Sequence, residues 1–315
     1  MTRIAIALFT LLAVTVSASV FAEPTVATFS IVAADPKSAE VGIAVASRFF
    51  AVGSVVPWGK AEVGAVATQA SADTTFGPRG LELLARGALP EEIAPILLRG
   101  DANASRRQFG IVTSDGKSIS YTGKDCGKWA GGRSGPNYAV QGNILAGEPV
   151  VIAMEEAFIS TKGTLADRMY AALLAGDAKG GDSRGKQSAS LQVWKAKAGY
   201  GGGDDRAIDI RVDDHVEPFK ELGRLLDYAQ MNYSWNEAWT LFMQKKGTEA
   251  LPHMERAAKL APKNAEAQYD LAVIRLAAGD RDGARVALDR ALELNPKLRA
   301  QAEKDPDLGE LRMKN

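Results

Sequence analysis

Residues 28–47, TFSIVAADPKSAEVGIAVAS, contain two apolar runs separated by a turn motif. The runs Thr28–Ala34 and Val41–Ser47 are dense in small and β-branched residues, which favour strands. The motif Asp35-Pro36-Lys37-Ser38 between them is typical of a turn. This stretch therefore predicts two consecutive strands at the start of a sheet-rich domain.

The residues that follow predict strands and helices in blocks. Further strands are expected at Val63–Ser71, Arg107–Thr113, Ser118–Thr122, Tyr138–Gln141, Ser188–Lys195 and Ala207–Val212. Helices are expected at Gly77–Arg86, Pro90–Arg99, Glu148–Ile159, Leu165–Leu174 and Val216–Met231. Because the blocks show no strict βαβ alternation, we expect an α+β fold in which two sheets are layered with helices.

The C-terminal part of the chain contains a helical repeat. The segment Arg256–Lys263, RAAKLAPK, recurs as Arg290–Lys297, RALELNPK, at the 34-residue spacing of tetratricopeptide repeats. Asn264–Pro296 resembles one full unit, Ser234–Pro262 is a weaker copy, and Lys297–Arg312 is expected to form a capping helix. We therefore expect a sheet-rich domain over residues 28–228 and a helical repeat domain over residues 232–315.

The first 22 residues have the pattern of a secretory signal peptide. Arg3 precedes the apolar run Ile4–Val16, which small residues follow. A cut after Ala22 leaves Glu23 first, whereas a cut as late as Ala27 exposes Thr28. We expect a periplasmic or secreted protein without a membrane span, since no later stretch is long and apolar enough to cross a bilayer.

Thr28 is a candidate nucleophile if processing makes it the first residue. A terminal α-amine with a pKa near ~8 can accept the proton of the neighbouring hydroxyl and later return it to a leaving group. If Glu23 remains first, residues 23–27 block that amine.

Composition excludes several other functional classes. The 38 basic and 38 acidic side chains balance, which gives no electrostatic argument for nucleic acid binding. Cys126 is the one cysteine, and with only His215 and His253 available the sequence predicts neither a disulfide nor a zinc site. No motif implies a cofactor or a metal. The acidic residues Asp204, Asp205 and Asp209 lack the calcium-loop pattern, so solvated carboxylates are the favoured interpretation.

Several segments, in their order along the chain, together resemble a bacterial family that is catalogued as a domain of unknown function. They are TFSIVA, VGIAVASRFFAVGSVVPW, VGAVATQ, YAVQGNILAGEPVV, GGDSRGKQSASLQVW and IDIRVDDH, between residues 28 and 215. Members of this family are similar in fold to N-terminal-nucleophile (Ntn) hydrolases. The resemblance implies a four-layer α-β-β-α sandwich and hydrolysis of an amide. In members without a leader the equivalent threonine follows the initiator methionine, whereas here an export signal precedes Thr28.

Three candidate partners of Thr28 lie on the expected neighbouring segments. Asn143, in the expected turn Gln141–Asn143, is a candidate donor to an oxyanion, and the alternative is a simple turn residue. Arg48 and Gln69 end strands that are expected to flank the first one, where they would orient the amine or a substrate carboxylate. The alternatives are a salt bridge for Arg48 and a sheet-edge amide for Gln69.

A second candidate cluster surrounds the last two strands. Ser188 opens a predicted strand and would hydrogen-bond the threonine amine, which Asp213 would anchor as a counter-ion. Gln187 and His215 are candidate substrate contacts, His215 as a proton shuttle or, alternatively, as a helix cap.

The sequence thus predicts an exported Ntn-type amidohydrolase that acts on a small-molecule or peptide amide. The alternative is a non-catalytic envelope scaffold protein that binds a protein or peptide partner in the groove of the repeat. Exposed strand edges and the repeat tail also favour a homo-oligomer.

Overall fold

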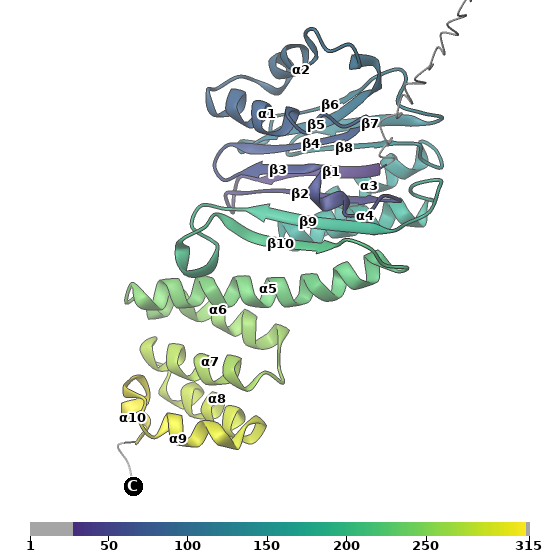
Figure 1. Ribbon diagram of the computed structural model, residues 1–315. Helices are drawn as coiled ribbons and strands as arrows, with labels where there is room; N and C mark the ends of the chain where they lie inside the picture. The colour runs from purple at the N-terminus through teal and green to yellow at the C-terminus, as the bar shows by residue number, and fades with distance from the viewer. Residues whose placement is uncertain (1–27, 313–315) are drawn as a thin grey trace, which may run out of the picture.

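The computed structural model describes residues 28–312, and the predicted signal peptide lies outside them. The described chain has a sheet-rich N-terminal part and an all-helical C-terminal part, which confirms the predicted α+β class with a helical tail (Figure 1). Within this part of the chain, none of the helices combines the length and the apolarity needed to span a bilayer.

A six-stranded antiparallel sheet contains the N-terminal strand near its centre. Its strands are β1 (Thr28–Asp35), β2 (Glu40–Ser47), β7 (Ala130–Gly135), β8 (Tyr138–Asn143), β9 (Ser188–Trp194) and β10 (Arg206–Val212), in the order β10-β9-β2-β1-β8-β7. β1 and β2 form the predicted hairpin, in which the Asp35 carboxylate accepts a hydrogen bond of 3.0 Å from the Lys37 backbone N–H. This Asx turn explains why the sequence DPKS reverses the chain.

A second, four-stranded antiparallel sheet packs face to face on the first. It consists of β3 (Pro57–Lys60), β4 (Gly64–Ala70), β5 (Arg107–Thr113) and β6 (Ser118–Thr122) in chain order. Alternate residues of β1 and β2, among them Val32 and Ile43, pack against Ala65 and Ala67 of β4. The small side chains let the two sheets approach each other closely.

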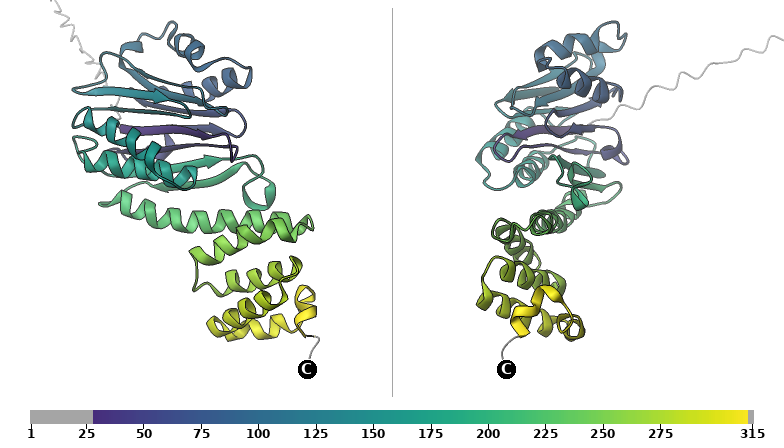
Figure 2. Two further views of the ribbon diagram at one scale, coloured as in Figure 1. Left: turned by 180° about the vertical axis from the view of Figure 1, so that it is seen from behind. Right: turned by 90° about the vertical axis from the view of Figure 1, so that its left-hand side faces the viewer.

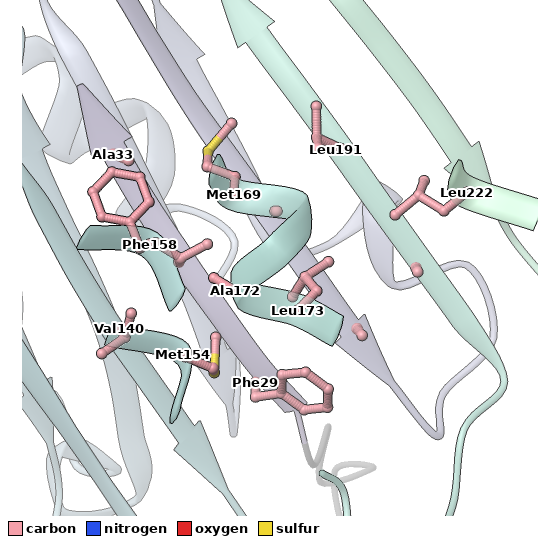
Figure 3. Close-up of a cluster of buried hydrophobic side chains, with 14 of the residues drawn as sticks. Phe29, Ala33, Val140, Met154, Phe158, Met169, Ala172, Leu173, Leu191 and Leu222 are labelled. Atoms are coloured by element: carbon pink, nitrogen blue, oxygen red, sulfur yellow. The ribbon is translucent and has the colours of Figure 1, made fainter. Parts of the chain in front are cut away.

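Helices cover the outer face of each sheet. α1 (Phe76–Ala85) and α2 (Pro90–Leu98) pack on the four-stranded sheet, and α3 (Pro149–Ser160) and α4 (Leu165–Ala178) pack on the six-stranded sheet. Figure 3 shows Phe29 and Ala33 of β1 with Phe158 of α3 and Leu173 of α4. The odd-numbered residues of β1 thus face the helices, and its even-numbered residues face the other sheet.

α5 (Pro218–Met243) joins the two parts of the molecule. Its first half contributes Phe219, Leu222 and Leu226 to the core of the six-stranded sheet, whereas Met231 and Ala238 belong to the core of the helical tail. The helix is longer than the predicted Val216–Met231, because its buried residues continue onto the repeat, and the predicted gap between residues 228 and 232 lies inside it.

The tail continues from α5 as antiparallel helices that extend away from the sheets (Figure 2). They are α6 (Gly247–Leu260), α7 (Ala265–Ala277) and α8 (Arg281–Leu294). The indole N–H groups of Trp235 and Trp239 on α5 both donate to Asp270 of α7, each over 2.7 Å. This shared carboxylate fixes the orientation of α5 against the first full repeat.

Residues Lys297–Arg312 do not form the single capping helix that the sequence predicted, so that prediction is wrong. The segment is divided into the 3-10 turns η4 (Pro296–Leu298) and η5 (Pro306–Leu308) and the short helices α9 (Arg299–Ala302) and α10 (Gly309–Arg312). Pro306 lacks a backbone N–H and so interrupts the helical hydrogen bonds. Ala302, Leu308 and Leu311 are nevertheless buried and cover the last apolar face of the tail.

β3 and β7 were not predicted from the sequence. Both are short, and β7 has the sequence AGGRSG, which lacks the β-branched residues that mark a strand. Their neighbours β4 and β8 supply the hydrogen bonds that hold them extended. Three further 3-10 turns, η1 (Val52–Ser54), η2 (Ala104–Arg106) and η3 (Tyr200–Gly202), lie in connections between elements.

A charged cluster ties the tail to the sheets. Glu237 of α5 binds Lys195 (Nζ–Oε1 2.6 Å) and His253 of α6 (Nδ1–Oε2 3.0 Å), while Tyr233 donates to the buried Glu40 over 3.0 Å. Burial opposes ionisation of Glu237, but the hydrogen bonds and charges of His253 and Lys195 lower its pKa to about 2. Burial, in contrast, raises the pKa of Glu40.

The Glu237→Gln variant is expected to lose part of the acid sensitivity of the fold. The folded-state pKa of Glu237 lies below the ordinary value of 4.5, so its stabilisation is complete above about pH 4.5 and is lost as the pH falls toward 2. This contribution is on the order of 2–3 kcal/mol. The raised pKa of Glu40 makes the opposite contribution to the pH dependence of stability, but Glu40 is present in both proteins. Urea unfolding of both proteins at about pH 6 and about pH 3 measures how much unfolding free energy each loses on acidification. An equal loss in both proteins would contradict the lowered pKa of Glu237.

Candidate active site

Thr28 is the first residue of the central strand β1. It pairs with Ser47 of β2 on one side and with Asn143 of β8 on the other. Its side chain is buried on the face toward the second sheet, and its Oγ1 lies 3.2 Å from the Ser47 Oγ. The candidate nucleophile therefore lies between the two sheets, with a hydroxyl and an amide on the adjacent strands.

A layer of buried polar side chains continues from Thr28 between the sheets. Gln69 of β4 donates to Gln108 of β5 (2.8 Å) and accepts a hydrogen bond from Ser30 (2.6 Å). Its Nε2 also lies 3.4 Å from the backbone oxygen of Thr28. Gln141 of β8 donates to the Ser30 hydroxyl over 2.7 Å. Because burying polar groups is costly unless they are hydrogen-bonded, this network holds its members in one arrangement.

Gln108 is the centre of this layer. Its Oε1 accepts from both Gln69 and Asn143 (2.8 and 2.9 Å), and its Nε2 donates to Gly142 O (2.8 Å) and Thr122 Oγ1 (2.9 Å). One amide thus connects both sheets at the depth of Thr28.

Asn143 lies differently from the prediction. It is the last residue of β8 and not a turn residue, since it pairs with Thr28 across the sheet. One N–H of its amide is used by Gln108, and its buried Oδ1 accepts no hydrogen bond within the described residues. A buried acceptor without a donor is costly, and a water, a ligand or a reacting group that donates to it removes that cost.

The backbone is strained where the strands around Thr28 end. Ile144, directly after Asn143, has φ +52°, and Ala70, directly after Gln69, has φ +65°. A β-branched residue in the left-handed region is a rare outlier. Such strain persists only where the surroundings enforce it, and it is concentrated at functional sites.

Gln69 reaches Thr28 from the opposite sheet. The sequence predicted that its strand flanks β1, which is wrong, because β4 belongs to the four-stranded sheet and contacts β1 face to face. The predicted proximity to Thr28 nevertheless holds, since sheets that pack face to face bring inward side chains together.

Ser188 and Arg48 lie near Thr28 but face other groups. Ser188 pairs with Ser47, and its hydroxyl donates to Phe49 O (2.5 Å) and accepts from Val52 N–H (3.2 Å). Arg48 follows Ser47, and its exposed side chain extends from the end of β2. Its backbone N–H donates to the buried Asp182 over 2.9 Å, a carboxylate that also binds Arg184. These contacts fix the loops at the Thr28 end of the sheet.

The remaining predicted residues form an outer rim. Asp213 and His215 are exposed after β10, and the structure does not bring the Asp213 carboxylate to Thr28. The His215 Nδ1 accepts from Glu217 N–H over 2.9 Å, in the exposed turn directly before α5. The Gln187 amide donates to Asp214 over 3.2 Å.

The sequence did not identify Ser30, Ser47, Gln108 or Gln141 as site residues. A signal for them existed, because each is a polar residue at an inward position of a strand that also carries small or apolar residues on that face. To recognise this signal in the sequence, one must know which face of each strand packs on the other sheet.

The described residues contain neither a cluster of metal-binding side chains nor a reactive thiol. No group of three or more histidine, cysteine or acidic side chains between residues 28 and 312 is placed to hold a metal ion. Asp204 and Asp209 pair instead with Arg206 and Arg211. Burial raises the pKa of Cys126 to about 11, which keeps its thiol protonated and unreactive.

In comparisons with known proteins, the two parts of the chain match different families. A tetratricopeptide repeat model matches residues 241–304, which confirms the predicted repeat. The crystal structure of protein SPO2555 from Silicibacter pomeroyi, described as a DUF1028 protein, is similar with a TM-score of 0.59 and 28% identity, over 65% of this chain and 89% of that one. A comparison with curated proteins finds no match. The model of the family of unknown function DUF1028 matches residues 28–222, more than half of the chain, and this protein therefore belongs to that family.

Proposed function

We propose that this protein is an exported amidohydrolase of the N-terminal-nucleophile type, with Thr28 as the nucleophile. The observation that carries the proposal is the position of Thr28, at the start of a central strand and facing a buried layer of hydroxyl and amide groups between two sheets. Two packed antiparallel sheets with helices on both outer faces support an α-β-β-α sandwich of the Ntn kind.

The proposed chemistry uses the α-amine of Thr28 as the base. The amine takes the proton of Oγ1 while the Oγ1–C bond forms at the scissile carbonyl, and it then returns the proton to the leaving nitrogen. Water hydrolyses the resulting ester and regenerates the hydroxyl. Ser47, whose Oγ lies 3.2 Å from Oγ1, orients the nucleophile.

Asn143 supports two roles in this scheme. Its Oδ1, which accepts no hydrogen bond within the described residues, is suited to accept one from the liberated amine of its cross-strand partner Thr28. The second N–H of its amide is available to the oxyanion, while the first is held by Gln108. Arg48, Gln187 and His215 on the rim loops are proposed to contact the substrate, and Arg48 is suited to a carboxylate.

We propose that one cleavage, directly before Thr28, both removes the export signal and activates the enzyme. Protein purified from the culture medium or the periplasm is expected to begin at Thr28, because only then is the amine free to act. Intact-mass measurement and N-terminal sequencing check this expectation. A purified chain that always retains residues 23–27 would overturn the mechanism.

A second function is proposed for the tail. The tetratricopeptide match favours a protein partner, and a cavity of about 750 Å³ lies between α5, the α6–α7 connection and the end of α8. Tyr228, 57% exposed, and Leu260 line it. Pull-down with the full chain and with its Tyr228→Ala variant tests this role, and recovery of the same proteins by both would locate the partner elsewhere.

A further inference from the structure

A second cavity, of about 560 Å³, lies where the loop between β9 and β10 meets the second half of α5. Its volume is typical of small-molecule sites, which measure about 300–1,000 Å³. α5 contributes Asn236, Trp239, Thr240 and Met243, and Gln244 directly follows the helix. Their spacing of three and four residues places them on one face of the helix. Tyr200 and Gly201 form the opposite wall. This cavity is separate from the Thr28 site and from the cavity of the tail.

The lining combines aromatic surface with neutral hydrogen-bonding groups. No lysine, arginine, histidine, aspartate or glutamate is among the lining residues. The side chains of Asn236, Thr240 and Gln244 make no hydrogen bond within the described residues, so their amide and hydroxyl groups are available. Tyr200 is 88% exposed and Met243 is 75% exposed, which leaves an apolar surface beside these polar groups.

The aromatic wall is held in place before any ligand arrives. The Trp239 indole N–H donates to Asp270 over 2.7 Å, and its ring makes an edge contact with Phe242 at a centroid distance of 5.0 Å. On the other side the chain turns through Gly201 and Gly202, whose φ values of +63° and +72° suit glycine. The fixed position of the Trp239 ring reduces the entropy lost on binding.

We propose that this cavity binds a neutral saccharide. A sugar ring presents an apolar C–H face, which stacks on aromatic rings, and a rim of hydroxyl groups, which pair with amides and hydroxyls. A nucleotide or another anion would find no cation among the lining residues, and a lipid chain would leave the three polar side chains unpaired. The neutral lining therefore favours a carbohydrate over both.

Titration of the full chain with chitotriose and with maltotriose tests this site by calorimetry. We expect saturable binding of at least one probe with a Kd between about 10 µM and 1 mM, within the range of weak ligand affinities. Tyr200→Ala and Gln244→Ala are expected to weaken it at least about tenfold, since each removes a wall or a hydrogen bond. Both side chains are exposed and make no hydrogen bond within the described residues, so these variants are expected to fold normally.

Tyr228→Ala is the matched control, because Tyr228 is an exposed aromatic residue on the first half of α5, outside this cavity. It should bind the probe as the unmodified chain does. Absence of binding to both saccharides, or equal binding by Tyr200→Ala, would overturn the proposal. Loss of binding in Tyr228→Ala alone would also overturn it, because the saccharide would then occupy the cavity of the tail.

Discussion

Replacement of Thr28 by alanine in the mature chain is expected to abolish amide hydrolysis, with a loss of at least about 10³-fold. The variant keeps the α-amine but lacks the oxygen that attacks the carbonyl in covalent catalysis. Thr28→Ser keeps the hydroxyl and is expected to retain part of the activity. Expression from a start codon directly before residue 28, followed by removal of the initiator methionine, supplies all three proteins.

Two measurements check this expectation without a known substrate. A panel of chromogenic acyl anilides reports turnover, and a β-lactone probe reports the nucleophile by the mass that it adds to the peptide beginning at Thr28. Thermal unfolding controls for the fold, since Thr28 is fully buried and its truncation is expected to cost about 1–2 kcal/mol. Equal turnover by folded Thr28→Ala protein, or acylation of another residue, would exclude the mechanism.

Replacement of Gln108 by leucine is expected to destabilise the sheet-rich part by about 3–5 kcal/mol. The substitution preserves much of the volume but removes the acceptor for Gln69 and Asn143 and the donor to Gly142. Each buried group left without a partner costs about 1–3 kcal/mol. Activity is expected to fall even where the protein remains folded, because Asn143 loses the contact that orients its amide.

Gln192→Leu provides the matched comparison for this effect. Gln192 is also a buried strand glutamine, 5% exposed, but its side chain makes no hydrogen bond within the described residues. We expect it to cost less than about 1 kcal/mol in urea unfolding. Similar losses for the two variants would show that the Gln108 network does not stabilise the fold.

Much of the architecture follows from local patterns. The strands β1, β2, β5 and β6 begin and end within a residue of their predicted bounds, because alternating β-branched residues and the turn motifs DPKS and SDGK act over short distances. The helical repeat is visible for the same reason, since its small and apolar residues recur at a fixed spacing.

The candidate site was only partly predictable. Thr28 was identified from its chemistry and its place behind a predicted leader, Asn143 from the amide of an expected turn residue, and Gln69 from its place at a strand end. Gln108 looked like an ordinary residue of a hairpin strand, and Asp213 looked like a partner of Thr28. Its exposure after β10 depends on the order of strands in the sheet, which no single segment encodes.

The sequence by itself determined the α+β class, the family, the repeat and the candidate nucleophile, because each rests on residues that are close together in the chain. The tertiary structure decided which polar groups surround Thr28. Ser30 meets Gln69 across 39 residues of sequence and Gln141 across 111, and only the packing of one sheet on the other brings them within hydrogen-bonding distance. The strict geometry of buried hydrogen bonds then fixes their arrangement.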